Sequence, residues 1–101
     1  MAIPPEVLRF RAANEGLRRT VYRDAPNDRP LAFVCECEDP HCNDFVKIDL
    51  ATLGSLRGDR QFVLLPAHHI RGGRRIARGR GYVIVAVEPE PLATGRPDAR
   101  R

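Results

Sequence analysis

All three cysteines of the chain, Cys35, Cys37 and Cys42, lie within eight residues of one another in the stretch CECEDPHC. Their spacing is C-x-C-x4-C, and Pro40 bends the loop before the third thiol. An odd number of crowded cysteines fits poorly with a disulfide framework. Thiolates and imidazoles are the ligands that zinc takes in closed tetrahedral sites. The sequence therefore predicts a metal site, with zinc as the cofactor.

The fourth ligand of such a site must come from another part of the chain. His41 is a poor candidate because a residue next to Cys42 is expected to point away from the same metal ion. His68 and His69 remain, and either would tie the cysteine loop to a distant segment. Three thiolates and one imidazole complete a tetrahedron without an open position, which predicts a structural rather than a catalytic metal.

Two other chemistries use the same thiols. An iron–sulfur cluster is disfavoured because only three cysteines and one further histidine are on offer. A redox sensor is the second alternative, since oxidation of zinc-bound thiolates releases the metal. In that case Cys35 or Cys37 would pair with Cys42, because thiols two apart in one strand do not easily reach each other.

The elements that must position these ligands begin with a helix from about Pro5 to Tyr22. A proline and a carboxylate in the first turn suit a helix N-terminus. One face carries residues at steps of three and four, which indicates an amphipathic helix: Val7, Phe10, Asn14, Leu17 and Val21. We expect Asn14, the polar member, to be a buried amide that hydrogen-bonds neighbouring backbone.

Short strands separated by turn residues follow the helix. We expect strands at 31–37, 44–50, 61–65, 74–78 and 82–87, the last being central, and a short helix at 52–57. The predicted fold class is α+β: an N-terminal amphipathic helix packed on a small antiparallel sheet, with zinc pinning the hairpin tip. Residues 1–88 are expected to form one zinc-stabilised domain. Residues 89–101 contain three prolines and no periodicity, which predicts a disordered tail.

The chain carries a net charge of +4, and Lys47 is its only lysine. A high-GC genome explains abundant arginine without any function. A basic balance is also typical of nucleic-acid binding, and one hairpin concentrates the charge. Its candidate phosphate-binding residues are Arg71, Arg74, Arg75, Arg78 and Arg80. Tyr82 is the only nearby aromatic residue for base stacking, so this function stands second.

The leading hypothesis is a non-catalytic zinc module that docks onto a protein partner. No nucleophile–base pair, phosphate-binding glycine loop or paired carboxylates can be identified, so we expect no enzyme and identify no small-molecule substrate. Acidic residues around the cysteines are interpreted as a solvated rim, or alternatively as a docking surface: Glu36, Glu38, Asp39 and Asp44. No apolar run approaches a membrane span, and we expect a cytoplasmic protein with reduced thiols.

Two resemblances bear on the site. The CECEDPHC stretch is similar to the post-SET zinc motif of lysine methyltransferases in its spacing alone. More broadly, the chain resembles a family of small uncharacterised actinobacterial proteins over residues 7 to 87. The matching residues are Asn14-Glu15, Phe33, the three cysteines, Phe62-Val63, Pro66-Ala67-His68 and Tyr82 to Val85.

This family resemblance implies that His68 is the fourth ligand, and it implies no activity. The chain departs from the family pattern at three positions. Ala67 replaces a glycine, His69 stands where an acidic residue is common, and Glu38 replaces a glycine after the second cysteine.

Overall fold

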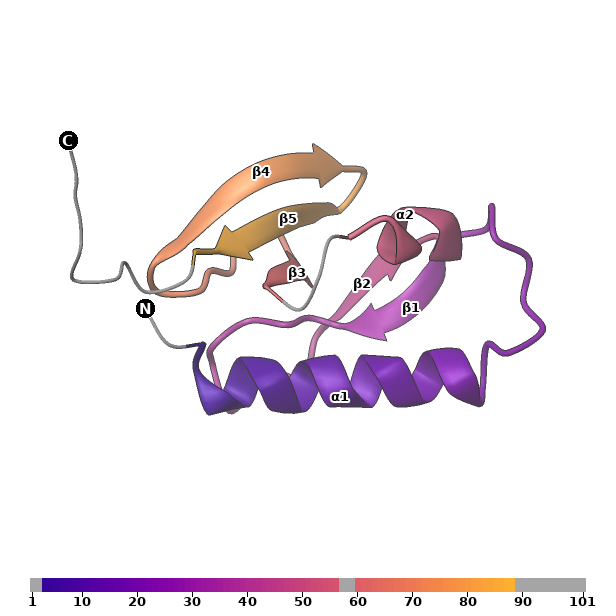
Figure 1. Cartoon of the computed structure of the whole chain (residues 1–101), viewed down its shortest axis with the longest axis horizontal. Helices are drawn as coiled ribbons and strands as arrows, with labels where there is room; N and C mark the ends of the chain where they lie inside the picture. Colours follow the sequence, from indigo (N-terminus) through magenta and orange to yellow (C-terminus); the bar gives the residue numbers. More distant parts are fainter. Residues whose placement is uncertain (1–2, 57–59, 89–101) are drawn as a thin grey trace, which may run out of the picture.

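The computed structural model describes residues 3–56 and 60–88, and it confirms the α+β class (Figure 1). The predicted tail at 89–101 lies outside the described residues. Strands form two antiparallel sheets rather than one, a pair β1-β2 and a three-stranded sheet in the order β3-β5-β4. The elements are α1 (Pro5–Arg19), β1 (Leu31–Val34), β2 (Phe45–Ile48), α2 (Leu50–Gly54), β3 (Gln61–Leu64), β4 (Gly73–Gly79) and β5 (Tyr82–Val87).

Helix α1 begins as expected, with proline in its first turn and Glu6 beside the N-terminus. It ends at Arg19, three residues before the predicted end. The Thr20 hydroxyl donates to the Gly16 carbonyl, and the Tyr22 backbone N–H donates to the Leu17 carbonyl, which closes the last turn. Val21 therefore lies beyond the helix and is 69% exposed, so its expected place on the buried face is wrong.

Helix α1 runs alongside β1 and covers its outer edge (Figure 1). The Asn14 side chain donates to the Val34 carbonyl at 2.9 Å and accepts from the Val34 N–H at 2.7 Å. The Tyr22 hydroxyl donates to the Ala32 carbonyl in the same way. The prediction of a buried amide at Asn14 is confirmed. These bonds satisfy backbone groups that an edge strand would otherwise leave unpaired.

The strand predicted to run from 31 to 37 stops at Val34, and this correction has a clear physical cause. The Cys35 N–H still donates across the hairpin to the Asp44 carbonyl. One residue later, the Glu36 N–H donates to the Val63 carbonyl of β3. The chain thus changes partner from β2 to β3, and residues 35–38 become the connection between the two sheets.

The three-stranded sheet has a buried central strand, β5, and an exposed edge strand, β4. Central strand β5 is buried from Val83 to Val87, as its apolar sequence predicts. Every residue of β4 is exposed, and its pairing with β5 shifts register between Arg75 and Ala77, which marks a β-bulge. No described helix has the length and apolar character needed to cross a bilayer.

Candidate metal centre

The structure brings the side chains of Cys35, Cys37, Cys42 and His68 together, with their ligand atoms all within 4.8 Å of one another. His68 Nδ1 lies 3.4 Å from Cys35 Sγ and 3.5 Å from Cys42 Sγ. Zinc–sulfur and zinc–nitrogen bond lengths in a tetrahedron require sulfur–nitrogen separations of about 3.6 Å. The two sulfur–nitrogen distances match this value, and the four atoms lie close enough together to bind one metal ion.

Separate local structures hold the ligands in place. Cys35 is fixed at the end of the β1–β2 hairpin, and its sulfur accepts the Leu65 N–H at 3.3 Å. Cys42 returns through a turn in which its N–H donates to the Asp39 carbonyl. His68 follows β3, where its N–H donates to the Leu65 carbonyl across the turn at Pro66. Any metal bound here would join the hairpin of the first sheet to the segment that follows β3 of the second.

The two buried thiols, Cys35 and Cys37, need a nearby cation to become thiolates in this setting. Burial raises the pKa of the Cys35 thiol, and the neighbouring Cys37 and Cys42 raise it further, while the Leu65 N–H partly opposes the rise. Burial also raises the pKa of the Cys37 thiol. Thiolates at these two buried positions are unfavourable by themselves, and a bound dication would supply the charge that stabilises them. The donor set therefore fits a metal ion.

The Asp44 carboxylate contacts the His68 imidazole on the side of the ring away from the cysteines. The carboxylate lies 3.5 Å from His68 Nε2, on the ring nitrogen that does not face the thiols. A proton on Nε2 serves this contact and leaves the Nδ1 lone pair directed at the cysteine sulfurs. Carboxylates in this position fix the tautomer of a metal-binding histidine and raise its basicity.

Replacing Asp44 by alanine should weaken metal binding by about 10- to 100-fold, the usual effect of losing such a partner. The Asp44 carbonyl that accepts the Cys35 N–H is retained, so the hairpin should remain folded. Competition with a coloured chelator measures the affinity. Asp24→Ala removes the same charge from a 90% exposed carboxylate and should bind metal like the unaltered chain. Equal affinities in the two variants would exclude this role for Asp44.

Glu36 is not part of an acidic rim, and this expectation is wrong: its side chain is completely buried. Its carboxylate accepts hydrogen bonds from Arg11 Nε at 3.0 Å, Arg11 Nη2 at 3.3 Å, Asn14 Nδ2 at 2.9 Å and the Val63 N–H at 3.0 Å. Arg11 also lies over the Phe62 ring, 4.4 Å from its centroid. Glu36 thus joins α1, the cysteine segment and β3 between two of the candidate ligands, Cys35 and Cys37.

Sequence reasoning missed this role for Glu36, although a signal existed. Arg11 and Asn14 are three residues apart on the helix, so their side chains share a face. The alternation of the cysteine segment turns Glu36 away from its neighbouring thiols and towards that face. Two polar donors on a buried helix face imply a buried acceptor, because buried polar groups are almost always hydrogen-bonded.

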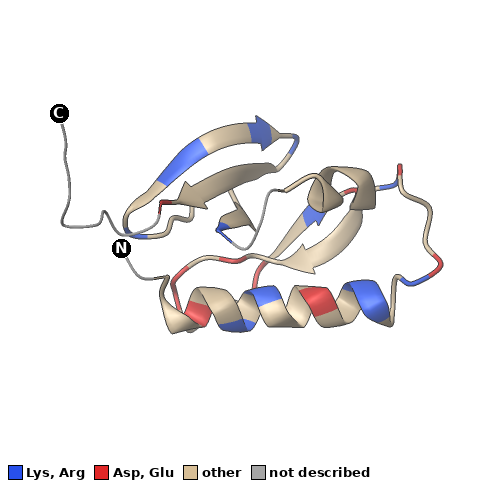
Figure 2. Cartoon of the chain, in the orientation of Figure 1, with Lys and Arg blue, Asp and Glu red and all other residues tan. Residues whose placement is uncertain are grey.

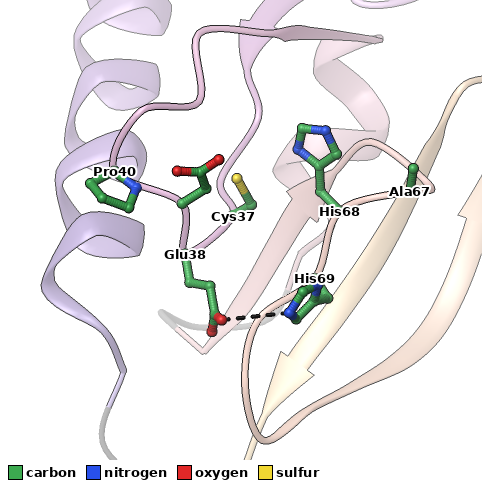
Figure 3. Close-up of a pocket in the computed structure, with 7 residues that line it drawn as sticks. Cys37, Glu38, Pro40, Ala67, His68 and His69 are labelled. Atoms are coloured by element: carbon green, nitrogen blue, oxygen red, sulfur yellow. Dashed lines mark ion pairs between the residues drawn. The ribbon is translucent and has the colours of Figure 1, made fainter.

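The other two histidines are outside the cluster. The structure places His69 Nε2 3.5 Å from the Glu38 carboxylate, with a side chain 77% exposed. His41 is exposed, and its N–H donates to the Asp39 carboxylate. An open cavity of about 390 Å³ adjoins the cluster, with Cys37 and His68 on one side and the Glu38–His69 pair at its rim (Figure 3).

The arginines of the basic hairpin do not act as one set. All five are exposed, and the charge gathers on β4 and its turn (Figure 2). Arg74 pairs with Glu88 at 3.3 Å, and the Arg75 guanidinium donates to the Pro66 carbonyl. Arg71 uses its backbone N–H to bind Glu38. Within the described residues, no ion pair or side-chain hydrogen bond engages Arg78 or Arg80.

No family model, curated protein or solved structure matches this chain. The chemistry assigned to the metal centre therefore rests on its donor set and its geometry.

Proposed function

We propose that this chain is a non-catalytic binding module whose fold is held together by one structural zinc ion. The observation that carries the proposal is the clustering of the ligand atoms of Cys35, Cys37, Cys42 and His68 within 4.8 Å, contributed by two segments far apart in the sequence. Four protein ligands leave no coordination position for a substrate or a reactive water. A closed site of this kind contributes stability rather than catalysis.

Zinc is the ion that this donor set favours. Thiolates with one imidazole in tetrahedral geometry suit zinc, whereas magnesium and calcium take oxygen ligands. Thiols act as ligands only while they are reduced, so we also propose that the protein works in a reducing compartment such as the cytoplasm. Because a closed metal site would support the fold and not a reaction, we propose that the protein acts through its surface on a macromolecular partner, with a protein as the first expectation.

Replacing His68 by alanine should abolish stoichiometric zinc binding, whereas replacing the adjacent His69 should not. His68 Nδ1 lies beside two cysteine sulfurs, and the exposed His69 pairs only with Glu38 among the described contacts. Elemental analysis with native mass spectrometry measures the metal content of the purified chains. We expect one zinc per chain in the unaltered protein and in His69→Ala, and substoichiometric zinc in His68→Ala.

Three results would contradict the proposal. Zinc retained by His68→Ala would remove this histidine from the site. Iron with visible absorbance in the unaltered chain would replace zinc with cluster chemistry. Absence of any metal in protein purified under reducing conditions would reject the structural metal altogether.

A further inference from the structure

An apolar groove lies between the two sheets, on the side of the β4–β5 turn. Its volume is about 570 Å³, and its lining is mostly apolar. Ile48 and Leu65 are among its lining residues, and two aromatic side chains, Phe45 of β2 and Tyr82 of β5, line it together. These aromatic residues are 37 positions apart in the sequence, so only the fold brings them to one surface.

The exposure of Phe45 is set by the register of its strand. In β2 the alternate residues Val46 and Ile48 are each 1% exposed and fill the core. Phe45 therefore belongs to the opposite face, and it is 60% exposed. Lys47, two residues on, shares that face and also lines the groove. The strand thus presents an aromatic ring and an ammonium group side by side.

The Tyr82 ring packs directly against Gly79. A Cβ atom added to Gly79 would lie 2.2 Å from the Tyr82 ring, so only glycine permits this close approach across the hairpin. Gly81 has φ of +85°, which allows the tight turn that brings Arg80 to the groove. The Tyr82 ring is therefore in place before any ligand binds, and the turn brings Arg80 beside it.

The charges at the groove favour an anionic ligand. Lys47 and Arg80 line it, and no described ion pair or side-chain hydrogen bond engages either of them. Asp49 also lines it, but its carboxylate accepts from the Thr52 N–H at 2.9 Å and the Thr52 hydroxyl at 2.7 Å as the cap of α2. From residue 71 to residue 87 the sequence contains five arginines and no acidic residue.

We propose that this groove binds single-stranded nucleic acid, with bases stacked on Phe45 and Tyr82 and flanking phosphates bound by Lys47 and Arg80. Aromatic faces beside a basic surface are the combination that single-stranded binders use. In a duplex the bases are already stacked on one another and offer no free face. This inference goes beyond the proposed zinc-stabilised module, because none of its residues belongs to the metal centre.

A peptide partner explains the groove less well. An acidic peptide would satisfy the cations but would leave two aromatic rings without a matching surface. Addition of a peptide strand to β4 is opposed by the bulge between Arg75 and Ala77 and by the charges along that edge. Arg75 lies opposite Val85 and Arg78 lies opposite Val83 in the β4–β5 pairing. Side chains alternate along β5, so these two valines point to the face of the sheet opposite Tyr82, and the two arginines point to that face with them. They contribute general attraction rather than contacts in the groove.

The test uses the zinc-loaded full chain and fluorescein-labelled oligonucleotides of 12 nucleotides, single-stranded or duplex, in fluorescence anisotropy at low salt. We expect the single strand to bind more tightly than the duplex. Phe45→Ala should weaken binding by about 5- to 150-fold, the range for loss of one stacking contact. Arg80→Ala should weaken it and reduce the slope of log affinity against log salt by about one.

Matched controls come from α1. Leu8→Ala removes an apolar side chain that is 46% exposed, and Arg19→Ala removes one exposed positive charge; both should bind like the unaltered chain. The chain contains no tryptophan, so Phe45→Trp adds a single indole whose fluorescence should be quenched when a base stacks on it. Zinc content and circular dichroism, measured for each variant, separate loss of the fold from loss of the contact.

Four outcomes would overturn the proposal. The first is no binding of the single strand at low salt, and the second is equal or tighter binding of the duplex. The third is an equal loss of affinity in Arg80→Ala and Arg19→Ala, together with unchanged affinity in Phe45→Ala. The fourth is displacement of the oligonucleotide by polyglutamate of equal charge, together with unquenched Phe45→Trp fluorescence. The last result would assign the surface to an acidic protein instead.

Discussion

If the four candidate ligands hold zinc as proposed, stripping the metal should unfold the whole domain rather than loosen one loop. Within residues 3–56 and 60–88 no β-ladder joins the two sheets, and backbone hydrogen bonds from Glu36 to Val63 and from Glu38 to His69 link them beside the candidate ligands. Structural zinc sites supply an apparent binding free energy of about 10–16 kcal/mol. That exceeds or equals the total stability of most domains, about 5–15 kcal/mol. Cys35→Ser should have the same effect, because it removes a buried ligand that also accepts the Leu65 N–H.

Thermal melts followed by far-ultraviolet circular dichroism measure this effect. With excess chelator, or with Cys35→Ser, the cooperative transition should disappear, and adding zinc back should restore it only in the unaltered chain. His41→Ala is the matched control, since it deletes an exposed imidazole beside Cys42 but leaves the four ligands in place. A chelated chain that still melts cooperatively within a few degrees of the zinc form would contradict a structural role for the metal.

Replacing Glu36 by glutamine should be the second most damaging change. Both carboxylate oxygens accept from donors, one from Val63 N–H and Arg11, the other from Arg11 and Asn14. The amide group of glutamine turns a donor towards donors in either orientation. Disrupting a buried ion pair by removing one partner costs about 3–5 kcal/mol, because the other charge is left without a counterion. Urea denaturation of the zinc-loaded protein should show this loss.

Glu15→Gln provides the control for the same chemical change on α1. The Glu15 side chain is 43% exposed and pairs with Arg18 only along the helix, so its loss should alter the free energy of unfolding by less than about 0.5 kcal/mol. A double-mutant cycle with Arg11→Met tests the pairing itself, since the two changes should be far from additive. If Glu36→Gln were no more destabilising than Glu15→Gln, the buried ion pair would not stabilise the fold.

The cysteine hairpin could be predicted because its information is local. Three thiols at C-x-C-x4-C spacing, flanked by alternating apolar residues, indicate both the ligands and the strands that carry them. The apolar run at 82–87 likewise indicates a central strand, and β5 occupies that place. The division into two sheets is not local. It depends on the partner of the Glu36 N–H, which is β3 and not β2.

Burial of charged and aromatic residues was harder to predict for a related reason. Alternation along a strand assigns Glu36 to the face opposite its neighbouring thiols, but only the docking of α1 makes that face interior. Phe45 is the opposite case, an aromatic residue that is exposed. Its hydrophobicity suggests a core position, yet Val46 and Ile48 already occupy the core side of β2. In both cases side-chain type is a weaker guide than the element that packs against it.

The unequal distribution of the ligands along the chain has a thermodynamic consequence. Three of them lie within one short loop, whereas His68 follows Cys42 by 26 residues. Closing a short loop costs little conformational entropy, so the unfolded chain can still hold zinc through its cysteines. Metal bound to the unfolded chain reduces the stabilisation that the folded state gains. The free energy of unfolding should therefore rise with zinc concentration and then level off. Its final value is set by the ratio of the zinc affinity of the folded chain to that of the unfolded chain.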